Sequence, residues 1–207
     1  MKKLIFSLLA LLLISVGVSA QTAPVVSDIP DQTIAEGDPF DIITLDDYVA
    51  DAETADEDII WTYSGNIELT VSIVDRVATI TTPNANWNGN ETITFIATDD
   101  GSPAQTGTDA ATFTVTAVND PPVVAGIPDQ TIAEGDPFVT IALDDYVTDV
   151  ETADAAIVWT YSGNTSLTVD ITSRVATITT PDENWNGSET ITFIATDDGS
   201  PAQTGTD

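Results

Sequence analysis

The sequence repeats itself at a fixed offset, and this duplication restricts the possible folds more than any other feature. Residues 29–40 recur unchanged as residues 127–138, an offset of 127 − 29 = 98, and residues 23–109 match residues 121–207 at 68 of 87 positions. A single period that holds along the whole chain is typical of tandem modules. Because a unit of about 100 residues can bury its own core, each copy is expected to be one domain. We place the first repeat at 21–120 and the second at 121–207.

The first 20 residues are predicted to be an export signal and not part of the fold. Lys2 and Lys3 precede an apolar run over residues 4–18, and Ala20 ends a short stretch of small residues that signal peptidase recognises. The apolar run is short for a membrane-spanning helix, and no second run follows it. We therefore expect cleavage after Ala20, an extracellular or cell-surface location, and no membrane insertion of the mature chain.

Short runs of alternating apolar and polar residues, separated by turn residues, predict an all-β fold for each repeat. The strands expected in the first repeat are residues 40–45, 59–63, 69–73, 76–82, 91–98 and 111–118, with a further strand at 25–26 or 33–34. About seven strands in roughly a hundred residues indicate tandem Ig-like Greek-key β-sandwiches. The aromatic residues expected in the core are Trp61, Tyr63, Trp87, Phe95 and Phe113.

The second repeat lacks the last predicted strand of the first. It reaches Asp207, the equivalent of Asp109, so the counterpart of residues 110–120 is missing. Without that strand, the strand expected at residues 189–196 would keep an unpaired edge, which folded proteins usually avoid. We therefore expect that the natural chain continues beyond this sequence.

The chain is strongly acidic, with 34 Asp and Glu residues against 4 Lys and Arg. Removal of the signal leaves Arg76 and Arg174 as the only basic residues, so the formal charge becomes 2 − 34 = −32. Such a surface repels nucleic acids and anionic lipids. The chain has no His or Cys, and no Lys after cleavage, so most nucleophile and general-base arrangements cannot form. We predict an exported protein without disulfides that is not an enzyme.

Acidic residues gather where predicted strands end, which is where a sandwich presents its loops. These positions are Glu36, Asp51, Glu53, Asp99, Asn119 and Asp120 in the first repeat and the link that comes after it. Calcium prefers six to eight oxygen ligands supplied by loops. Because bringing carboxylates together costs free energy unless a cation neutralises them, we predict Ca²⁺ binding. The alternative is that these are ordinary Asp and Asn turn residues.

The order of the motifs resembles cadherin repeats, most closely the bacterial cadherin-like tandem repeats of large secreted and surface adhesins. The resemblance covers essentially all of residues 23–207 and rests on Glu36-Gly37 with Pro39-Phe40, Asp51-Ala52-Glu53, Asp99-Asp100-Gly101-Ser102-Pro103 and Val118-Asn119-Asp120-Pro121-Pro122. It implies cadherin-like sandwiches with calcium between successive repeats. For the junction of the two repeats it implies the ligands Glu36, Asn119, Asp120, Asp149, Glu151 and Asp197. For the junctions on either side it implies Glu134, Asp51, Glu53 and Asp99.

The sequence departs from animal cadherins at two places. Their Leu-Asp-Arg-Glu segment is replaced by residues 82–87, and the link between the repeats is shorter than Asp-x-Asn-Asp-Asn. Both changes remove ligands, so we expect fewer ions and weaker binding at each junction.

The function predicted is a calcium-binding extracellular adhesion or stalk module. Its partners would be neighbouring repeats of the same chain, and glycans or surface proteins. The alternatives are a carbohydrate-binding module that uses Trp87 and Trp185, and a structural spacer that does not need calcium.

Overall fold

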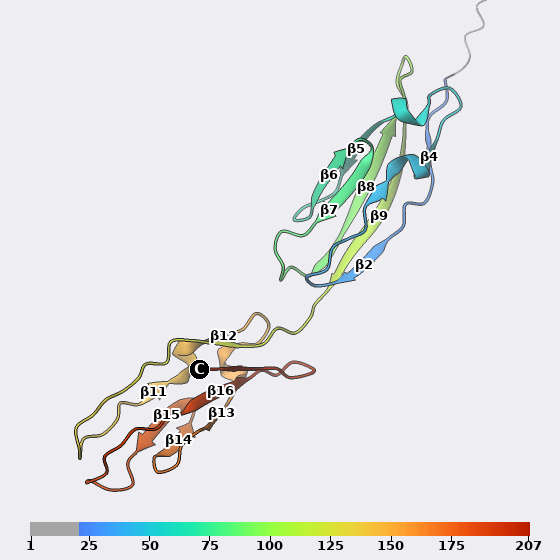
Figure 1. Cartoon of the computed structure of the whole chain (residues 1–207). Helices are drawn as coiled ribbons and strands as arrows, with labels where there is room; N and C mark the ends of the chain where they lie inside the picture. Colours follow the sequence, from blue (N-terminus) through green and yellow to red (C-terminus); the bar gives the residue numbers. More distant parts are fainter. Residues whose placement is uncertain (1–20) are drawn as a thin grey trace, which may run out of the picture. The chain divides into compact units, whose positions relative to one another are not determined.

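The computed structural model describes residues 21–207, which form two compact all-β units (Figure 1). The predicted signal, residues 1–20, lies outside the described residues. The first unit holds the chain up to Ile34, Asp38–Asn84 and Gly89–Val115. The second unit holds Thr116–Asp207 together with two short segments of the first repeat, Ala35–Gly37 and Ala85–Asn88.

The strands of the first repeat are short except for one long pair. They are β1 (Val25–Val26), β2 (Gln32–Ala35), β3 (Ile43–Thr44), β4 (Val49–Ala50), β5 (Ile60–Ser64), β6 (Thr70–Val74), β7 (Val77–Thr81), β8 (Gly89–Thr98) and β9 (Thr106–Thr116). Two 3₁₀ helices interrupt them, η1 (Leu45–Tyr48) and η2 (Asp56–Asp58).

These strands form the two layers of a Greek-key β-sandwich, which confirms the predicted fold class. One layer has the order β2-β9-β8-β5, and the other has β3-β7-β6, while β1 pairs with β4 (Figure 1). The antiparallel pair β8–β9 is the longest ladder, from Gly89 opposite Val115 to Thr98 opposite Thr106. Because successive side chains of a strand point to opposite faces, β8 buries Ile93, Phe95 and Ala97 and turns Thr94 and Ile96 outward.

The core of the first unit is built around Phe113 of β9. Its ring is fully buried and meets the edge of Phe40 at a centroid distance of 5.3 Å and that of Phe95 at 6.5 Å. Edge-to-face contacts of this kind add about 0.5–1.5 kcal/mol each to the free energy gained by burial. The predicted core positions Trp61, Phe95 and Phe113 are confirmed. Tyr63 lies on the same face of β5 as Trp61 but is 39% exposed, near the end of this edge strand.

The structure corrects three further details of the sequence analysis. The strand expected at residues 40–45 is reduced to β3, because the chain turns into η1 at Leu45. Both alternatives for the additional strand are realised, as β1 and β2. Trp87 is only half-buried and belongs to a segment of the second unit, so it does not close the core of the first.

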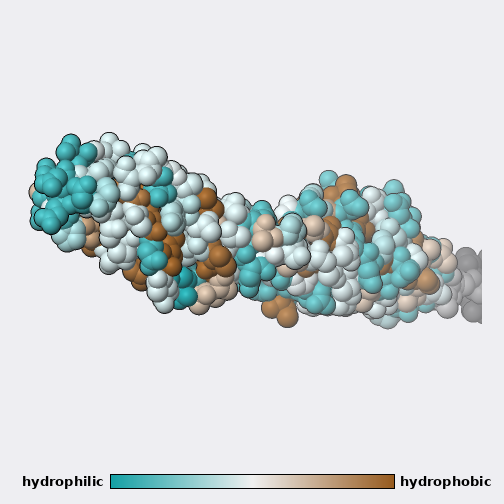
Figure 2. Space-filling view, turned by 90° about the horizontal axis from the view of Figure 1, so that it is seen from below, coloured by the Kyte–Doolittle hydropathy of each residue, from teal (hydrophilic) through white to brown (hydrophobic). Residues whose placement is uncertain are grey.

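Hydrophobic atoms reach the surface of both units between hydrophilic ones (Figure 2). In the first repeat Ile42, Ile67 and Val74 are 67%, 86% and 64% exposed. Threonine occupies all three equivalent positions of the second repeat. Isoleucine, valine and threonine share a branched Cβ that suits extended backbone, so these outward positions accept an apolar residue or a threonine.

The strands of the second repeat follow the same order, but β16 and β17 are shorter than their counterparts β8 and β9. They are β10 (Val123–Val124), β11 (Ile141–Ala142), β12 (Val147–Thr148), β13 (Val158–Ser162), β14 (Thr168–Thr172), β15 (Val175–Thr179), β16 (Thr192–Thr196) and β17 (Thr204–Thr206), with the 3₁₀ helices η3 (Leu143–Tyr146) and η4 (Asp154–Ala156). The sheets have the orders β13-β16-β17 and β11-β15-β14, and β10 pairs with β12. None of the helices in the described part of the chain is long and apolar enough to cross a membrane.

In the described part of the second sandwich no strand corresponds to residues 110–116 of β9, and the neighbouring strands are shorter than in the first. The ladder between β16 and β17 extends to a mutual pair of backbone hydrogen bonds between Phe193 and Asp207 and goes no further. Residues 187–191 and 130–133 are not strands, although their counterparts in the first repeat belong to β8 and β2. The strand expected at 189–196 therefore begins only at Thr192, because a strand needs a hydrogen-bonded neighbour.

Each repeat places its single arginine in the turn of a hairpin. Arg76 lies between β6 and β7 and Arg174 between β14 and β15, both with positive φ as a tight two-residue turn requires. The guanidinium of Arg76 contacts Asp46 of η1 at 2.9 Å, and that of Arg174 contacts Asp144 of η3 at 2.8 Å. The basic charge of each described unit is thus committed to tying a hairpin to a 3₁₀ helix.

A glutamate in each repeat accepts several backbone hydrogen bonds from one loop, which lies between β5 and β6 in the first repeat and between β13 and β14 in the second. Glu91 accepts the N–H groups of residues 67–69 at 2.6 to 3.2 Å. Glu189 accepts those of residues 165–167 over the same range, and also the hydroxyl of Thr165 at 2.7 Å. The hydrogen bonds from Thr165, with those from the next two residues, outweigh desolvation and lower the pKa of Glu189 to about 2.

This geometry predicts how the second unit responds to acid. Because the folded pKa of Glu189 lies below its ordinary value of 4.5, its stabilising effect is complete above that pH and is lost as the pH falls towards 2. The difference in stability between the wild type and Glu189→Gln should therefore shrink between pH 5 and pH 3. Urea unfolding of both proteins across this range measures it, and a difference that does not change with pH would contradict the assignment.

Candidate metal centre

Two acidic loops of the second unit are held in shape by their own carboxylates. Asp149, after β12, accepts the backbone N–H groups of Glu151 and Thr152 at 3.0 and 2.7 Å. Asp197, after β16, accepts those of Gly199 and Gln203 at 3.0 and 2.9 Å. In both cases one oxygen organises the loop, so the second oxygen of each carboxylate is available for other partners.

The link between the repeats joins these two loops. The side-chain amide of Asn119 donates to Oδ2 of Asp197 at 2.9 Å, and the side chain of Gln203 donates to the carbonyl oxygen of Asn119. The backbone N–H of Asp120 donates to Oε2 of Glu151 at 3.1 Å. The predicted set Asn119, Asp120, Asp149, Glu151 and Asp197 is thus brought together within one unit.

Glu36 completes this group through the segment Ala35–Gly37, which belongs to the second unit. Its Oε2 accepts hydrogen bonds from the side chain of Asn88 at 3.4 Å and the backbone N–H of Val118 at 3.3 Å. One carboxylate oxygen from each of Glu36, Asp120 and Glu151 lies within 4.8 Å of the other two. Three carboxylates at this spacing repel one another, and no arginine lies among them.

Two buried oxygens in this group have no hydrogen-bond partner, namely Oε1 of Glu36 and Oδ2 of Asp149. Buried polar atoms are almost always satisfied in folded proteins, so such atoms call for a missing partner. A hard divalent cation is a fitting partner, because Ca²⁺ binds carboxylate and carbonyl oxygens and neutralises their charge. The residues present therefore fit a calcium ion.

Hydrogen bonds favour the ionised form of Asp197. Burial raises the pKa of its carboxyl group, but hydrogen bonds from Gln203, Asn119 and Gly199 lower it further than burial raises it. The net effect is a pKa below the ordinary value of an aspartate. A carboxylate that stays charged in a buried place is the form that a metal ligand needs.

The first unit carries the equivalent loops with one important difference. Asp51 accepts the N–H groups of Glu53 and Thr54, and Asp99 accepts those of Gly101 and Gln105. Oδ2 of Asp51 and Oδ2 of Asp99 are buried without a partner, and the side chain of Asp99 is only 2% exposed.

The difference lies at the position equivalent to Asp120, where the first repeat has Thr22. Its N–H and hydroxyl groups both donate to Glu53, at 3.2 and 2.7 Å. At this position the first unit therefore has a hydroxyl group where the second has a carboxylate.

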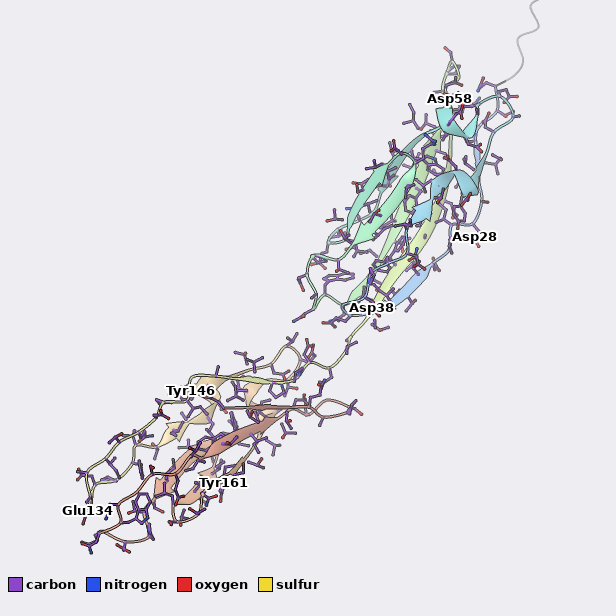
Figure 3. All side chains as sticks on the ribbon, viewed as in Figure 1. Asp28, Asp38, Asp58, Glu134, Tyr146 and Tyr161 are labelled. Atoms are coloured by element: carbon purple, nitrogen blue, oxygen red, sulfur yellow. The ribbon has the colours of Figure 1, made fainter. Side chains whose placement is uncertain are left out.

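Glu134 is a predicted ligand that lies outside the cluster. It is exposed and lies at the end of the second unit, in a loop beside the segment that contains Glu183 (Figure 3). Its counterpart Glu36 takes part in the cluster only because it meets the link that comes after the first repeat. Among the described residues no equivalent link lies near Glu134.

The polar residues that hold the loops together were not predicted from the sequence. Thr54 is 5% exposed and donates its hydroxyl to Asp100 at 2.9 Å, and Thr152 does the same to Asp198. Asp100 follows a strand directly, and this position favours an ordinary turn residue. Its contact with Thr54, 46 positions away in the sequence, cannot be predicted from such local spacing. The unchanged recurrence of Thr54 and Asp100 at the repeat offset was the available signal.

Solved structures with the same fold are cadherin extracellular domains. No family model and no curated protein matches the sequence. The crystal structure of Drosophila N-cadherin EC1-4 is 18% identical, with a TM-score of 0.51 over 90% of this chain and 48% of that one. Mouse Cadherin-23 EC22-24 is also 18% identical, with a TM-score of 0.51 over 89% of this chain and 62% of that one. The chain thus spans less than two thirds of either. At these identities the likeness shows the fold alone, which is the cadherin-like β-sandwich.

Proposed function

We propose that this protein is a calcium-binding extracellular adhesion or stalk module of the bacterial cadherin-like kind. Calcium would bind the cluster of Glu36, Asp120 and Glu151 and stiffen the junction between the repeats. The observation that carries the proposal is that carboxylate oxygens of these three residues lie within 4.8 Å of one another, while Oε1 of Glu36 and Oδ2 of Asp149 are buried without a hydrogen-bond partner. Asn119, Asp149 and Asp197 would supply further oxygens.

The charge of the chain gives calcium a structural role. At 4.8 Å, two carboxylates at a protein surface repel each other by roughly 3 kcal/mol with an effective dielectric constant of 20. A divalent cation turns this repulsion into attraction, and it binds only when the three carboxylates are close together. Calcium would therefore favour the conformation in which Ala35–Gly37 stays with the second unit.

The remaining predicted residues extend the same role to neighbouring repeats. Asp51, Glu53 and Asp99 would bind calcium at the junction with a preceding repeat, and Glu134 would do so with a following one. An N-terminal signal over residues 1–20 would export the chain to surroundings where calcium is abundant. In a repeat array each unit contacts mainly its neighbours, so reach and stiffness are the useful properties.

Calcium is expected to raise the melting temperature and to increase the radius of gyration. Free calcium at a hundred times its Kd stabilises the bound form by about 2.7 kcal/mol, a shift on the order of 10 °C for a unit of this size. Thermal melts and X-ray scattering in millimolar Ca²⁺, in millimolar Mg²⁺ and in chelator measure both effects. Mg²⁺ controls for general screening of the acidic surface, because it prefers a tighter octahedral site. Coincident curves in Ca²⁺ and chelator would identify a calcium-independent spacer instead.

A further inference from the structure

Asn88 lies beside the cluster of Glu36, Asp120 and Glu151, although it is not among the ligands predicted from the sequence. It belongs to the segment Ala85–Asn88, which is part of the second unit. Its side-chain amide donates to Oε2 of Glu36 at 3.4 Å. Glu36 also supplies one of the three carboxylate oxygens that lie within 4.8 Å of one another. Asn88 therefore brings a neutral amide to the edge of a group of negative charges.

This hydrogen bond holds the amide of Asn88 only weakly. Its length of 3.4 Å exceeds the usual range of about 2.7–3.2 Å. The side chain of Asn88 is exposed, and within residues 21–207 its amide has no second hydrogen bond. Because the terminal torsion of an asparagine is broad, the amide can turn about its Cβ–Cγ bond at little cost. Such a turn exchanges the positions of the NH₂ group and the carbonyl oxygen.

A cation at the cluster would reverse the preferred orientation of this amide. Next to carboxylates alone, the NH₂ group is the favoured end, because it donates a hydrogen bond to a negative oxygen. Next to a divalent cation, the carbonyl oxygen is favoured, because Ca²⁺ binds asparagine oxygens as well as carboxylates. Oε1 of Glu36 is buried without a hydrogen-bond partner, so this carboxylate also has an oxygen available for the same cation.

An amide ligand adds an oxygen to the site without adding charge. The cluster already contains three carboxylates, and a fourth would increase their repulsion whenever calcium is absent. Calcium binds about six to eight oxygen ligands, so neutral oxygens have to complete its coordination. Asparagine at residue 88 meets both requirements.

The second repeat contains the same residue without the same contact. Asn186 is the equivalent of Asn88, and its side-chain amide donates to the backbone carbonyl of Asn184 at 3.3 Å. Among the described residues no hydrogen bond joins it to Glu134, the counterpart of Glu36. Asn186 is therefore a matched position outside the cluster.

We propose that Asn88 is a further calcium ligand, which turns its amide so that Oδ1 binds the ion held by the cluster. Without calcium the same side chain donates a hydrogen bond to Glu36. Asn88 thus has two roles, as a hydrogen-bond donor in the calcium-free chain and as an oxygen ligand in the calcium-bound chain. This inference rests on the proposed function, because it requires calcium at the cluster.

The test is calcium binding to the full chain and its variants, measured by isothermal titration calorimetry. Asn88→Ala should raise the Kd for calcium by about tenfold, because it removes an oxygen ligand. Asn186→Ala should leave the Kd unchanged. Asn88→Asp should lower the Kd by about tenfold, because calcium affinity follows the charge of the ligand set. If Asn88 only positioned Glu36 by donating to it, Asn88→Asp would raise the Kd instead, because an ionised aspartate cannot donate.

Two further measurements separate a ligand from a nearby charge. In concentrated KCl the long-range effect of an added carboxylate is screened, so a lower Kd of Asn88→Asp that persists there indicates direct binding. The ¹³C resonance of the side-chain carbonyl of Asn88 should shift when calcium binds, whereas that of Asn186 should not.

The outcomes distinguish this inference from the proposed function. If the wild type binds calcium but Asn88→Ala binds it equally well, Asn88 is not a ligand and the calcium site stands without it. A raised Kd of Asn88→Asp, or an unchanged carbonyl resonance of Asn88, would likewise overturn the inference alone. If the wild type does not bind calcium, both the inference and the proposed function are wrong.

Discussion

Replacing Asp120 by asparagine is expected to change the stability of the chain in opposite directions with and without calcium. In chelator, Asp120→Asn removes the repulsion of Asp120 by Glu36 and Glu151 and should stabilise the protein by about 1–3 kcal/mol, depending on the effective dielectric constant. In calcium, the lost ligand charge should weaken calcium binding by about tenfold or more, equivalent to 1.4 kcal/mol. The two curves of stability against calcium should therefore cross.

The substitution preserves the local backbone contact. The hydrogen bond from residue 120 to Glu151 is donated by the backbone N–H, which asparagine keeps. Glu134→Gln is the matched control, because it removes the same charge from the second unit at a position outside the cluster. Urea unfolding of the three proteins in chelator and at several calcium concentrations gives the curves. If stability depends on calcium concentration in the same way for Asp120→Asn and Glu134→Gln, only the net charge matters. That result would contradict a defined calcium site at the cluster.

The equivalent phenylalanines Phe95 and Phe193 are expected to differ in what their removal costs. Phe95 is fully buried and packs against Phe113, so Phe95→Ala should destabilise the first unit by about 3–5 kcal/mol, the usual range for a buried aromatic residue. Phe193 lines an open groove of the second unit with a volume of about 650 Å³, and no described residue takes the place beside it that Phe113 takes beside Phe95. Phe193→Ala should therefore destabilise the second unit by about 1–2 kcal/mol less, because part of its packing is already absent.

Hydrogen exchange on the full chain separates the two effects. The free energy of local opening is read from amides of residues 89–98 for the first unit and 192–196 for the second. Each variant should affect its own unit and leave the other within error, because sites far apart without shared partners are additive. In the chain extended by residues 110–120, Phe193→Ala should cost as much as Phe95→Ala. Equal costs in the 207-residue chain would mean that the groove does not weaken the core around Phe193.

Much of the fold could be predicted from the sequence, because its main signals are local. The alternation over residues 91–98 fixes which side chains face the core, and the repeat offset transfers the pattern from one unit to the other. The 3₁₀ helix η1 was missed because Leu45 and Tyr48 fit either a strand or a single helical turn. The contact that favours the turn, between Asp46 and Arg76, joins residues 30 positions apart.

The candidate site was predicted as a set of residues but not as a geometry. Motif order indicated Glu36, Asp120 and Glu151, whereas the approach of their carboxylate oxygens to within 4.8 Å of one another depends on segments more than 80 residues apart meeting in one unit. Glu36 and Glu134 occupy the same position of the same motif. Among the described residues, only Glu36 contacts a link that follows a repeat. The residues that surround each copy of a repeated glutamate come from the chain segment that follows its repeat. Spacing within the repeat gives no information about that segment.

The arginine of each hairpin turn has a consequence for the chemistry of the whole chain. Arg76 and Arg174 are held by Asp46 and Asp144, so neither serves as an internal counterion for the acidic loops. The balancing charge for those loops must come from dissolved ions. Under the proposed function, the ions in the surrounding solution therefore set the stiffness of the chain. The same polypeptide would be flexible in monovalent salt and rigid where divalent cations are abundant.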